Sequence, residues 1–336
     1  MTKTAVVILN WNGEAHLRRF LPSVVRNTPP EVAVIVADNG SADGSVGMLQ
    51  REFPSVRIIC LDRNYGFAEG YNRALDSVDC EYCVLLNSDV ETPEGWIEPL
   101  VRCLDSDSRI AAAAPKLLSF ENRSEFEYAG AAGGYIDWLG YPFCRGRILQ
   151  TVERDDGQYD DSRKVFWVSG AAFCCRLNVF KQLGGFASEF FAHMEEIDLC
   201  WRMQLAGWSV VIEPKSAVYH LGGGTLVKNS PRKVFYNHRN NLAMLFRCAS
   251  GGQRFAAAIL RPLTDLVAAL SYLVQLHPDW AWAVVRAYWD FIKWHGRLAD
   301  ERRRIRASVV GEPSTIYNGS IVIRYMLGLR RFGKLM

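Results

Sequence analysis

Asn87, Ser88 and Asp89 stand directly after the apolar run 82–86, and side chains of these types could bind a metal ion with phosphate groups. A short apolar run that ends in polar residues is typical of a strand buried on both faces of a sheet. Ligands of open α/β sheets bind at the carboxyl ends of the strands, so Asp89 would lie at a binding edge. Its carboxylate could hold a divalent cation that bridges two phosphates. A plain turn is the alternative, because all three residue types favour turns.

Two further apolar runs end in polar side chains. Asn10 and Asn12 follow the run 5–9, and Asp38 follows the run 32–37. The carboxyl ends of parallel strands meet at one edge of the sheet, so these side chains should converge with Asp89. Asp38 could accept a hydrogen bond from a nucleobase N–H group or a ribose hydroxyl.

Gly66 and Gly70 flank the start of an expected helix, where free backbone N–H groups attract phosphate. Their spacing is G-x-x-x-G, so the dinucleotide-binding fingerprint is absent, and no phosphate-binding P-loop motif occurs in the chain. Together with Asp38 and Asp89, the glycines predict a nucleoside diphosphate bound with a metal ion.

A second group of candidate residues lies near the middle of the chain. Glu195, Glu196 and Asp198 crowd one expected helix start, where a favourable interaction with the helix dipole and a capping role for Asp198 would explain one or two acids. Aromatic residues precede them at 190–191, and acids beside apolar rings have raised pKa values, which suits a general base. His220 ends a predicted strand before three glycines and is either a metal ligand or an ordinary surface histidine.

The composition restricts the classes of protein to consider. A net charge of +3 argues against a general polyanion binder, and nine cysteines without a disulfide pattern indicate a reducing compartment. Cys80 and Cys83 form an isolated C-x-x-C at the start of a strand, which favours a structural role. No signal peptide or uninterrupted transmembrane run is found, the longest candidate being 263–276, so a cytoplasmic location is expected.

Strand–helix alternation must position these side chains. Strands are predicted at 5–9, 32–37, 56–60, 82–86 and 110–115, with helices at about 14–26, 41–53, 67–77 and 95–104 between them. This order predicts an α/β fold with a mostly parallel sheet covered by helices on both faces. Loops and short strands are expected over 119–164. Further strands are expected at 165–168, 209–213 and 218–220, and helices at 177–183 and 199–206.

The chain beyond residue 246 reads as helical. Leu260, Leu263, Val267, Leu270 and Val274 recur at helical spacing. Four tryptophans at 280–294 stand among basic residues, which suits docking on an anionic membrane surface, whereas a helical cap with a solvated basic tail is the alternative. No nucleic-acid-binding motif accompanies the arginines.

Eight segments, in this order, carry a resemblance to a known family. They are VVILNWNG (6–13), VADNGSADGS (36–45), NYGFAEGYN (64–72), LLNSD (85–89), VSGAA (168–172), GGF (184–186), EEIDLCWR (195–202) and HLGGGT (220–225). The chain resembles the family 2 glycosyltransferases, GT-A-fold enzymes that use nucleotide-sugar donors, and more narrowly their bacterial rhamnosyltransferase-type branch. The matching segments span most of residues 5–245.

The resemblance implies a role for each matched residue. The nucleotide-sugar would be held by Asn10, Asn12, Asp38, Asn64, Gly66, Gly70, Asn87 and Ser88, with Arg239 facing the diphosphate. Asp89 would bind the metal as the last residue of the D-x-D motif, with His220 as a further ligand. Glu196 stands where the family has its catalytic aspartate, and Glu195 and Asp198 are substitutes. Residues 222–228 would form a loop that closes over the donor.

The resulting hypothesis is an inverting glycosyltransferase that depends on Mg²⁺ or Mn²⁺. A dTDP- or UDP-sugar, with rhamnose as one candidate sugar, would be the donor, and a saccharide or lipid-linked saccharide the acceptor. Residues 1–245 would form the catalytic domain, divided at 118/119 into donor and acceptor halves, and 246–336 a helical extension at the inner face of the plasma membrane. A degenerate nucleotide-sugar-binding protein is one alternative. A sugar nucleotidyltransferase is another, but the basic Gly-rich loop it needs after the first strand is absent.

Overall fold

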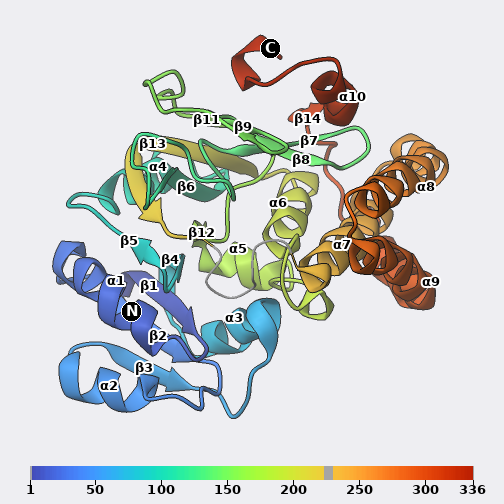
Figure 1. The fold of residues 1–336 in the computed structure, drawn as a ribbon. Helices are drawn as coiled ribbons and strands as arrows, with labels where there is room; N and C mark the ends of the chain where they lie inside the picture. Colours follow the sequence, from blue (N-terminus) through green and yellow to red (C-terminus); the bar gives the residue numbers. More distant parts are fainter. Residues whose placement is uncertain (1, 223–229, 336) are drawn as a thin grey trace.

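The computed structural model describes residues 2–222 and 230–335, and its centre is a large sheet with helices on both faces (Figure 1). The strands run in the order β11-β13-β6-β12-β4-β1-β2-β3, and β5 pairs with the end of β13. Their bounds are β1 Thr2–Asn10, β2 Ala33–Asp38, β3 Arg57–Cys60, β4 Cys80–Asn87, β5 Val90–Glu91, β6 Ile110–Ser119, β11 Arg163–Lys164, β12 Ala172–Arg176 and β13 Ser209–His220. The predicted α/β class is confirmed.

The sheet is mixed rather than mostly parallel. Strands β3, β2, β1 and β4 run parallel, as the crossover helices between them require. Strand β12 lies antiparallel to both β4 and β6, and β5 and β11 lie antiparallel to β13. The expected strand at 165–168 is wrong, because these residues pack in irregular backbone. The two strands expected at 209–213 and 218–220 are one strand, β13, with a bulge between its halves.

Alternate side chains of the central strands pack into two separate cores. Val6 and Ile8 of β1 face helices α1, α2 and α4, whereas Val7 faces α3, α5 and α6. This burial on both faces explains why the strands read as continuous apolar runs. The helix bounds are α1 Glu14–Asn27, α2 Ser45–Glu52, α3 Gly66–Asp76, α4 Glu98–Ser106, α5 Leu177–Gln182, α6 Glu195–Leu205, α7 Pro231–Cys248, α8 Gly251–Val274, α9 Pro278–Ala307 and α10 Ile321–Met326, with short 3-10 turns at Ser188–Phe190 and Phe332–Lys334.

The segment 119–164 folds into a second, smaller sheet, in line with the expected short strands. Its strands are β7 Gly134–Asp137, β8 Pro142–Cys144, β9 Arg147–Ile148 and β10 Thr151–Val152, joined by β14 Ile316–Tyr317 from the far end of the chain. Strand β14 pairs with β7 in parallel, and the fully buried Asp137 accepts a hydrogen bond of 3.0 Å from the Ile321 N–H group.

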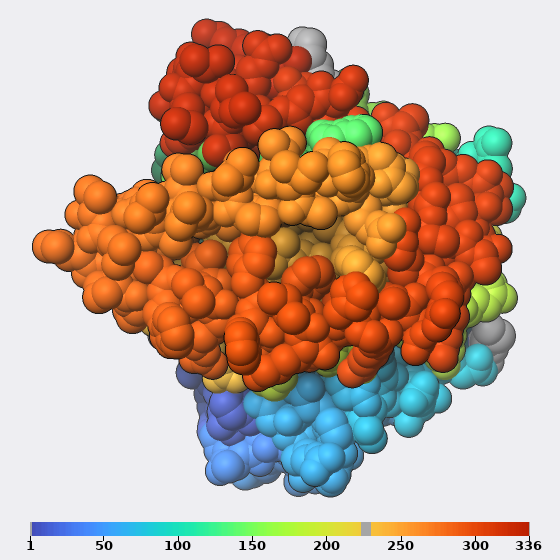
Figure 2. All heavy atoms as spheres, turned by 90° about the vertical axis from the view of Figure 1, so that its right-hand side faces the viewer, coloured from blue at the N-terminus to red at the C-terminus, as the bar shows by residue number. Residues whose placement is uncertain are grey.

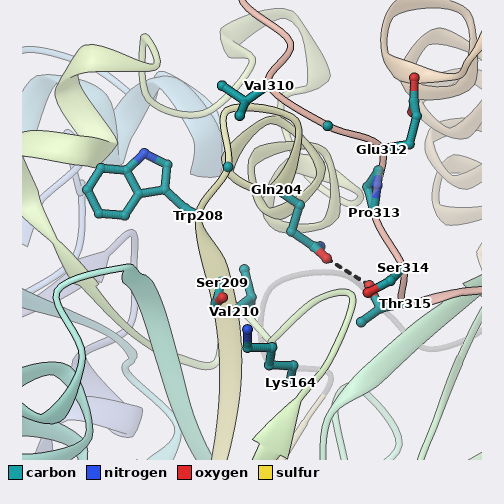
Figure 3. A pocket seen from close by; sticks show the side chains of 12 residues that line it. Lys164, Gln204, Trp208, Ser209, Val210, Val310, Glu312, Pro313, Ser314 and Thr315 are labelled. Carbon is teal, nitrogen blue, oxygen red and sulfur yellow. Dashed lines mark hydrogen bonds between the residues drawn. The ribbon is translucent and has the colours of Figure 1, made fainter.

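The C-terminal third is therefore not a separate extension. The expected boundary at 245 falls inside α7, and the chain after α9 returns to the catalytic part. Figure 3 shows this return, where the residues after α9 line a pocket of about 210 Å³ beside the end of α6. There the Thr315 hydroxyl donates to the Gln204 side chain at 2.7 Å, and the Val310 N–H group donates to the Leu205 carbonyl at 2.7 Å. None of the expected donor-site residues lines this pocket.

Helix α8 differs from the expectation that no segment could cross a membrane. Among the described residues it is the one helix long and apolar enough to do so, by length and composition alone. Its apolar run is interrupted by Arg261 and Asp265, which are buried against the rest of the protein. Figure 1 shows α7, α8 and α9 together at one side of the molecule.

A buried ionic network ties α6 to α7 and α9. The Arg247 guanidinium of α7 lies 2.6 Å from the Asp198 carboxylate of α6, 3.2 Å from Glu189 and 2.8 Å from Glu301 of α9. Arg202 contacts the same Asp198 oxygen at 2.8 Å. Burial acts to raise the pKa of Asp198, but Arg247 and then Arg202 lower it overall. Each carboxylate depends on these guanidinium groups, because a lone buried charge is very costly.

We expect Arg247→Ala to lower the free energy of unfolding by about 3–5 kcal/mol, because it removes the buried guanidinium group that three carboxylates share. Urea unfolding followed by circular dichroism measures the change. Arg304→Ala, at an exposed position of the same charge, is the control and should change the value by less than about 0.5 kcal/mol. Equal stability of the two variants would contradict a supporting role for the network.

Candidate functional site

The ends of β1 and β2 bring Asn10 and Asp38 together. They are register partners, and the Asn10 amide donates to the Asp38 carboxylate at 3.0 Å and to the Ser41 hydroxyl at 3.2 Å. The other Asp38 oxygen accepts from the Ser41 N–H group at 2.9 Å. Asn12 adopts the left-handed conformation, with φ of 50°, and its side chain accepts from the Ala42 N–H group at 2.8 Å. The Asn10 side-chain oxygen is buried without a partner, so it remains available to a ligand donor.

Asn87, Ser88 and Asp89 lie at the adjacent strand end. Leu9 of β1 is opposite Asn87 of β4 in the parallel register, so this end is next to Asn10. Gly13 makes the approach possible, since a Cβ atom there would lie 2.4 Å from the Asn10 side-chain oxygen and 3.8 Å from the Ser88 hydroxyl. The predicted convergence of the three strand ends is therefore present in the fold.

His220 reaches this edge from β13. The short strand β5 pairs with the end of β13, and this pairing sets the His220 ring beside Asp89. Its Nε2 lies 3.2 Å from the Asp89 carboxylate and 3.4 Å from the Asn87 amide nitrogen. The His220 side chain is buried and contacts residues that lie far from it in the sequence. His220 is therefore part of the site and not a surface histidine.

Glu127 is a site residue that the sequence analysis missed. Its carboxylate lies 3.5 Å from Nδ1 of His220, on the side of the ring opposite Asp89. The Ala129 N–H group donates to the same carboxylate and holds it in place. Glu127 belongs to the segment 119–164, which has no regular periodicity. The only signal in the sequence was the position of this acid between two aromatic residues, Phe126 and Tyr128.

The two carboxylates control the charge of His220. Burial acts to lower the pKa of the imidazole, but Glu127 and Asp89 raise it to about 10. Burial likewise acts to raise the pKa of each carboxyl group, and His220 brings both below their ordinary values. In the absence of other cations the imidazolium balances part of this buried negative charge.

The Asp89–His220 pair fits the spacing of two ligands on one metal ion. Two ligands at right angles, with bonds of about 2.1 Å, lie about 3.0 Å apart, close to the 3.2 Å between Asp89 Oδ1 and His220 Nε2. Within residues 2–222 and 230–335, no group of three or more His, Cys, Asp or Glu side chains is arranged as a complete metal site. An ion held here would need further oxygen ligands, which a diphosphate could supply.

Glu196 lies at the start of α6, close to the same strand ends. A Cβ atom at Gly170 would lie 3.9 Å from the Glu196 Cβ, and the neighbouring Ala171 carbonyl accepts from the Asn87 N–H group at 3.0 Å. Burial raises the pKa of Glu196 to about 7, although backbone N–H groups oppose the shift. Glu195 is buried, and burial followed by repulsion from Glu196 raises its pKa well above the ordinary value, which favours its neutral form.

The backbone before α6 is strained. Phe191, His193 and Met194 all have positive φ, at 65°, 71° and 72°, which is unfavourable for side chains of this kind. The Asn240 amide of α7 spans this loop, donating to the carbonyls of Phe190 at 3.0 Å and His193 at 2.8 Å. The surrounding structure thus imposes the position from which Glu196 projects.

Two expected roles are corrected by these contacts. Asp198 is not a substitute base, because it is fully buried between Arg202 and Arg247. Arg239 does not face the donor site. Its guanidinium donates to the Phe190 carbonyl at 3.2 Å and lies 4.2 Å from the centre of the Trp294 ring, so it supports the loop before α6.

The start of α3 is also not a free phosphate site. The Gly66 N–H group donates to the Asn64 side chain at 2.8 Å, and the Phe67 N–H group donates to the Phe191 carbonyl at 2.7 Å. Gly66 is required because a Cβ atom would lie 2.5 Å from the Phe191 ring, and one at Gly70 would lie 2.9 Å from the Asn39 side chain. Asn64, Gly66 and Gly70 therefore shape the edge of the site. The loop expected at 222–228 lies, apart from Gly222, outside the described residues.

Comparison with known proteins agrees with this arrangement. A family profile described as "Glycosyl transferase family 2" matches residues 5–180, which is more than half of the chain. The chain belongs to glycosyl transferase family 2. It is therefore a glycosyltransferase, and the predicted family is confirmed.

Relatives of known function lie within the same group of enzymes. The chain is 29% identical, over 74% of its length and 86% of the relative, to the N-acetylglucosaminyl-diphospho-decaprenol L-rhamnosyltransferase of Mycobacterium tuberculosis. It is 28% identical, over 69% of its length and 45% of the relative, to the pre-mycofactocin glycosyltransferase of the same species. The rhamnosyltransferase-like branch is thereby supported.

Solved structures confirm the GT-A fold. The S. aureus TarS fragment 1–349, in complex with UDP-GlcNAc, has a TM-score of 0.56 at 15% identity, over 91% of this chain and 88% of that one. GalNAc-T7, solved with UDP, GalNAc and Mn²⁺, has a TM-score of 0.56 at 17% identity, over 74% of this chain and 48% of that one.

Replacement of Glu127 by Gln should lower the pKa of His220, because it removes one of the two carboxylates that stabilise the imidazolium. In the folded state the pKa of His220 is above its ordinary value. Its contribution to stability is therefore complete below about pH 6.5 and is lost as the pH rises through about 10.

An NMR titration of the imidazole in metal-free protein measures this shift. Glu91→Gln is the control, since Glu91 lies on the neighbouring strand β5 but pairs with Arg123 at 2.7 Å. An identical His220 titration in the Glu127→Gln variant and the parent protein would show that Glu127 does not act on the ring.

Proposed function

We propose that the chain transfers a sugar from a nucleotide-diphosphate donor to an acceptor hydroxyl, with inversion and with the help of a divalent cation. The observation that carries this proposal is the placement of two different groups at the same edge of the sheet. One is the Asp89–His220 pair with metal-ligand spacing, and the other is Glu196 with a pKa of about 7. A metal ion at the first could stabilise a charged leaving group, and the second could act as a proton acceptor.

The donor would lie across the ends of β1, β2 and β4. Asp38 and the unpartnered Asn10 oxygen could accept hydrogen bonds from the nucleoside, and Ser88 would face the diphosphate. Asp89 and His220 would hold Mg²⁺ or Mn²⁺, which when bound neutralises the negative charge that grows on the leaving diphosphate. Solved relatives of the fold contain Mn²⁺ with UDP or with GDP-mannose. A dTDP- or UDP-sugar is our proposed donor, with rhamnose as a candidate because of the rhamnosyltransferase relative.

Glu196 would act as the general base. Its carboxylate takes the proton of the acceptor hydroxyl while the hydroxyl oxygen forms a bond to the anomeric carbon. The bond between that carbon and the diphosphate oxygen breaks on the opposite face, so the configuration inverts. A pKa of about 7 serves this step because the group accepts a proton readily and about half of it is deprotonated at neutral pH.

A saccharide joined to a lipid diphosphate is the proposed acceptor class. The mycobacterial relative is named for an acceptor in which N-acetylglucosamine is linked through a diphosphate to decaprenol. Such an acceptor places the reaction at a membrane, which agrees with the expected position of the protein at the inner face of the plasma membrane.

Glu196→Gln should reduce the rate of sugar transfer by about 10²–10⁴-fold, because the amide cannot take up the proton. Donor binding should be retained. In the parent protein the rate should rise with pH through about 7, as Glu196 loses its proton. Transfer from a panel of nucleotide-sugars gives the rate, and isothermal titration calorimetry gives donor binding. Exposed Glu121→Gln is the matched control. A Glu196→Gln enzyme as fast as the control would remove Glu196 from this role.

Asp89→Ala should abolish the part of nucleotide binding that depends on the metal. A thermal-shift panel of UDP, dTDP and GDP, each with Mg²⁺, Mn²⁺ or EDTA, measures this effect. The parent protein should be stabilised by one nucleotide only when a metal is present, since the bridging ion supplies the attraction. The same metal-dependent shift in parent and Asp89→Ala proteins would place the metal elsewhere.

A further inference from the structure

Helix α8 has its polar side turned toward the protein and its apolar side turned outward. Arg261 and Asp265 are 2% and 1% exposed and form an ion pair at 3.2 Å. Asp265 also accepts from the Tyr288 hydroxyl of α9 at 2.7 Å and lies 3.3 Å from the His238 ring of α7. In a surface helix of a water-soluble protein, the charged side chains would face the solvent and the leucine side chains would face the core.

From Phe255 onward, after the exposed Arg254, the outward side of α8 is an apolar surface without charge. The exposed apolar side chains of α8 and of the residues just after it are Phe255, Ile259, Leu260, Leu263, Leu266, Val267, Leu270, Leu273, Val274 and Leu276. The charged residues between 255 and 278 are Arg261 and Asp265, and both are buried. Isolated apolar residues are common on protein surfaces, but a continuous patch along a whole helix marks an interaction site.

Helix α9 extends this surface. Trp282, Val285, Trp289 and Ile292 are all more than half exposed and follow one another at helical spacing. Arg286 and Lys293, which are exposed beside this stripe, supply positive charge at its margin. Figure 2 shows α8 and α9 side by side on one face of the molecule, with the loop between them projecting outward. We use the name outer face for the exposed apolar side chains of α8 and α9 together.

We propose that the outer face docks on an anionic phospholipid membrane, with α8 lying in the plane of the interface. The buried ion pair argues against α8 crossing the bilayer, since Arg261 and Asp265 keep their partners only while α8 stays packed on α7 and α9. Tryptophan side chains with basic neighbours are typical of the boundary between lipid headgroups and acyl chains.

The charges of the neighbouring chain favour lipid over a second copy of the protein. Residues 278–320, which contain α9, carry seven Lys and Arg and five Asp and Glu. This excess is attracted to anionic headgroups, whereas two copies facing each other would bring like charges together. The inference rests on the proposed function in one respect, because a lipid-linked acceptor requires the enzyme to reach a membrane.

Sedimentation of the full-length protein with mixed vesicles of phosphatidylglycerol and phosphatidylcholine tests the proposal. The parent protein should sediment with these vesicles at low salt. Leu263→Glu with Leu270→Glu should weaken vesicle binding by about tenfold or more, because two carboxylates would enter the apolar interface. Arg286→Glu with Lys293→Glu should weaken it and reduce its dependence on salt. Met326→Glu with Leu327→Glu, equally exposed but on α10 and just beyond it, is the matched control and should bind like the parent.

Quenching of tryptophan fluorescence by brominated lipids gives a second reading. The quenching should decrease in a Trp282→Phe, Trp289→Phe variant, which keeps the size and apolar character of both sites. A parent protein that stays in solution, or equal vesicle binding by the α8 variant and the control, would overturn the proposal. A dimer in sedimentation velocity that dissociates in the α8 variant, without vesicle binding, would show that a second copy covers the outer face.

Nucleotide binding with Mn²⁺ in the same preparations separates this inference from the proposed function. If the protein binds nucleotide but not vesicles, only the proposal of membrane docking is contradicted. If the protein binds vesicles through the outer face but binds no nucleotide, membrane docking is supported and the proposed function is contradicted.

Discussion

The burial of His220 between Asp89 and Glu127 is the interaction on which the site depends. The three side chains come from β13, the turn after β4 and the segment before the second sheet, so they meet only when both sheets are in place. Two buried carboxylates repel each other unless a cation lies between them, and the imidazolium supplies that cation in the free protein. If a metal ion were held by Asp89 and His220, the ring would have to give up a proton, and Glu127, 3.5 Å from Nδ1, would then orient the remaining N–H group. Metal binding should consequently release a proton at neutral pH.

The proposed base and the proposed pair of metal ligands are held by different parts of the chain. Strand pairing fixes Asp89 and His220, whereas α7 fixes the strained loop that leads to Glu196. The second arrangement explains why the C-terminal third packs so closely on the catalytic part. Arg239 and Asn240 bind the loop carbonyls, and Arg247 neutralises Asp198 within α6 itself. A loop with three residues at positive φ is stable only because these contacts are stronger than the strain.

Short-range patterns in the sequence were sufficient to predict which residues lie at the strand ends. They were not sufficient to predict the contacts that these residues make with distant parts of the chain. Asn10, Asp38 and Asp89 could be predicted because each directly follows a buried strand, and parallel strands share one edge. Glu127 could not, because its role arises from a contact across 93 positions of the chain with His220. Gly66 read as a phosphate-binding glycine, yet its N–H group is taken by Asn64 and its missing side chain makes room for Phe191. Arg239 was likewise expected to face the diphosphate, because the family resemblance assigns it there. Only the packing of α7 against Trp294 shows that its partners are carbonyls and an aromatic ring.

Helix α7 connects the outer face with Glu196, the proposed base. Its residue His238 contacts Asp265, which belongs to the buried side of α8, and the next two residues bind the loop before Glu196. A helix is stiff over such a short distance, so the separation between the outer face and the Glu196 carboxylate cannot change much without breaking one of these contacts. An acceptor whose lipid part stays in a membrane has its sugar at a restricted height above the surface. A rigid link between the surface-binding element and the base is the arrangement that would meet such an acceptor at one constant height, and a flexible linker would not.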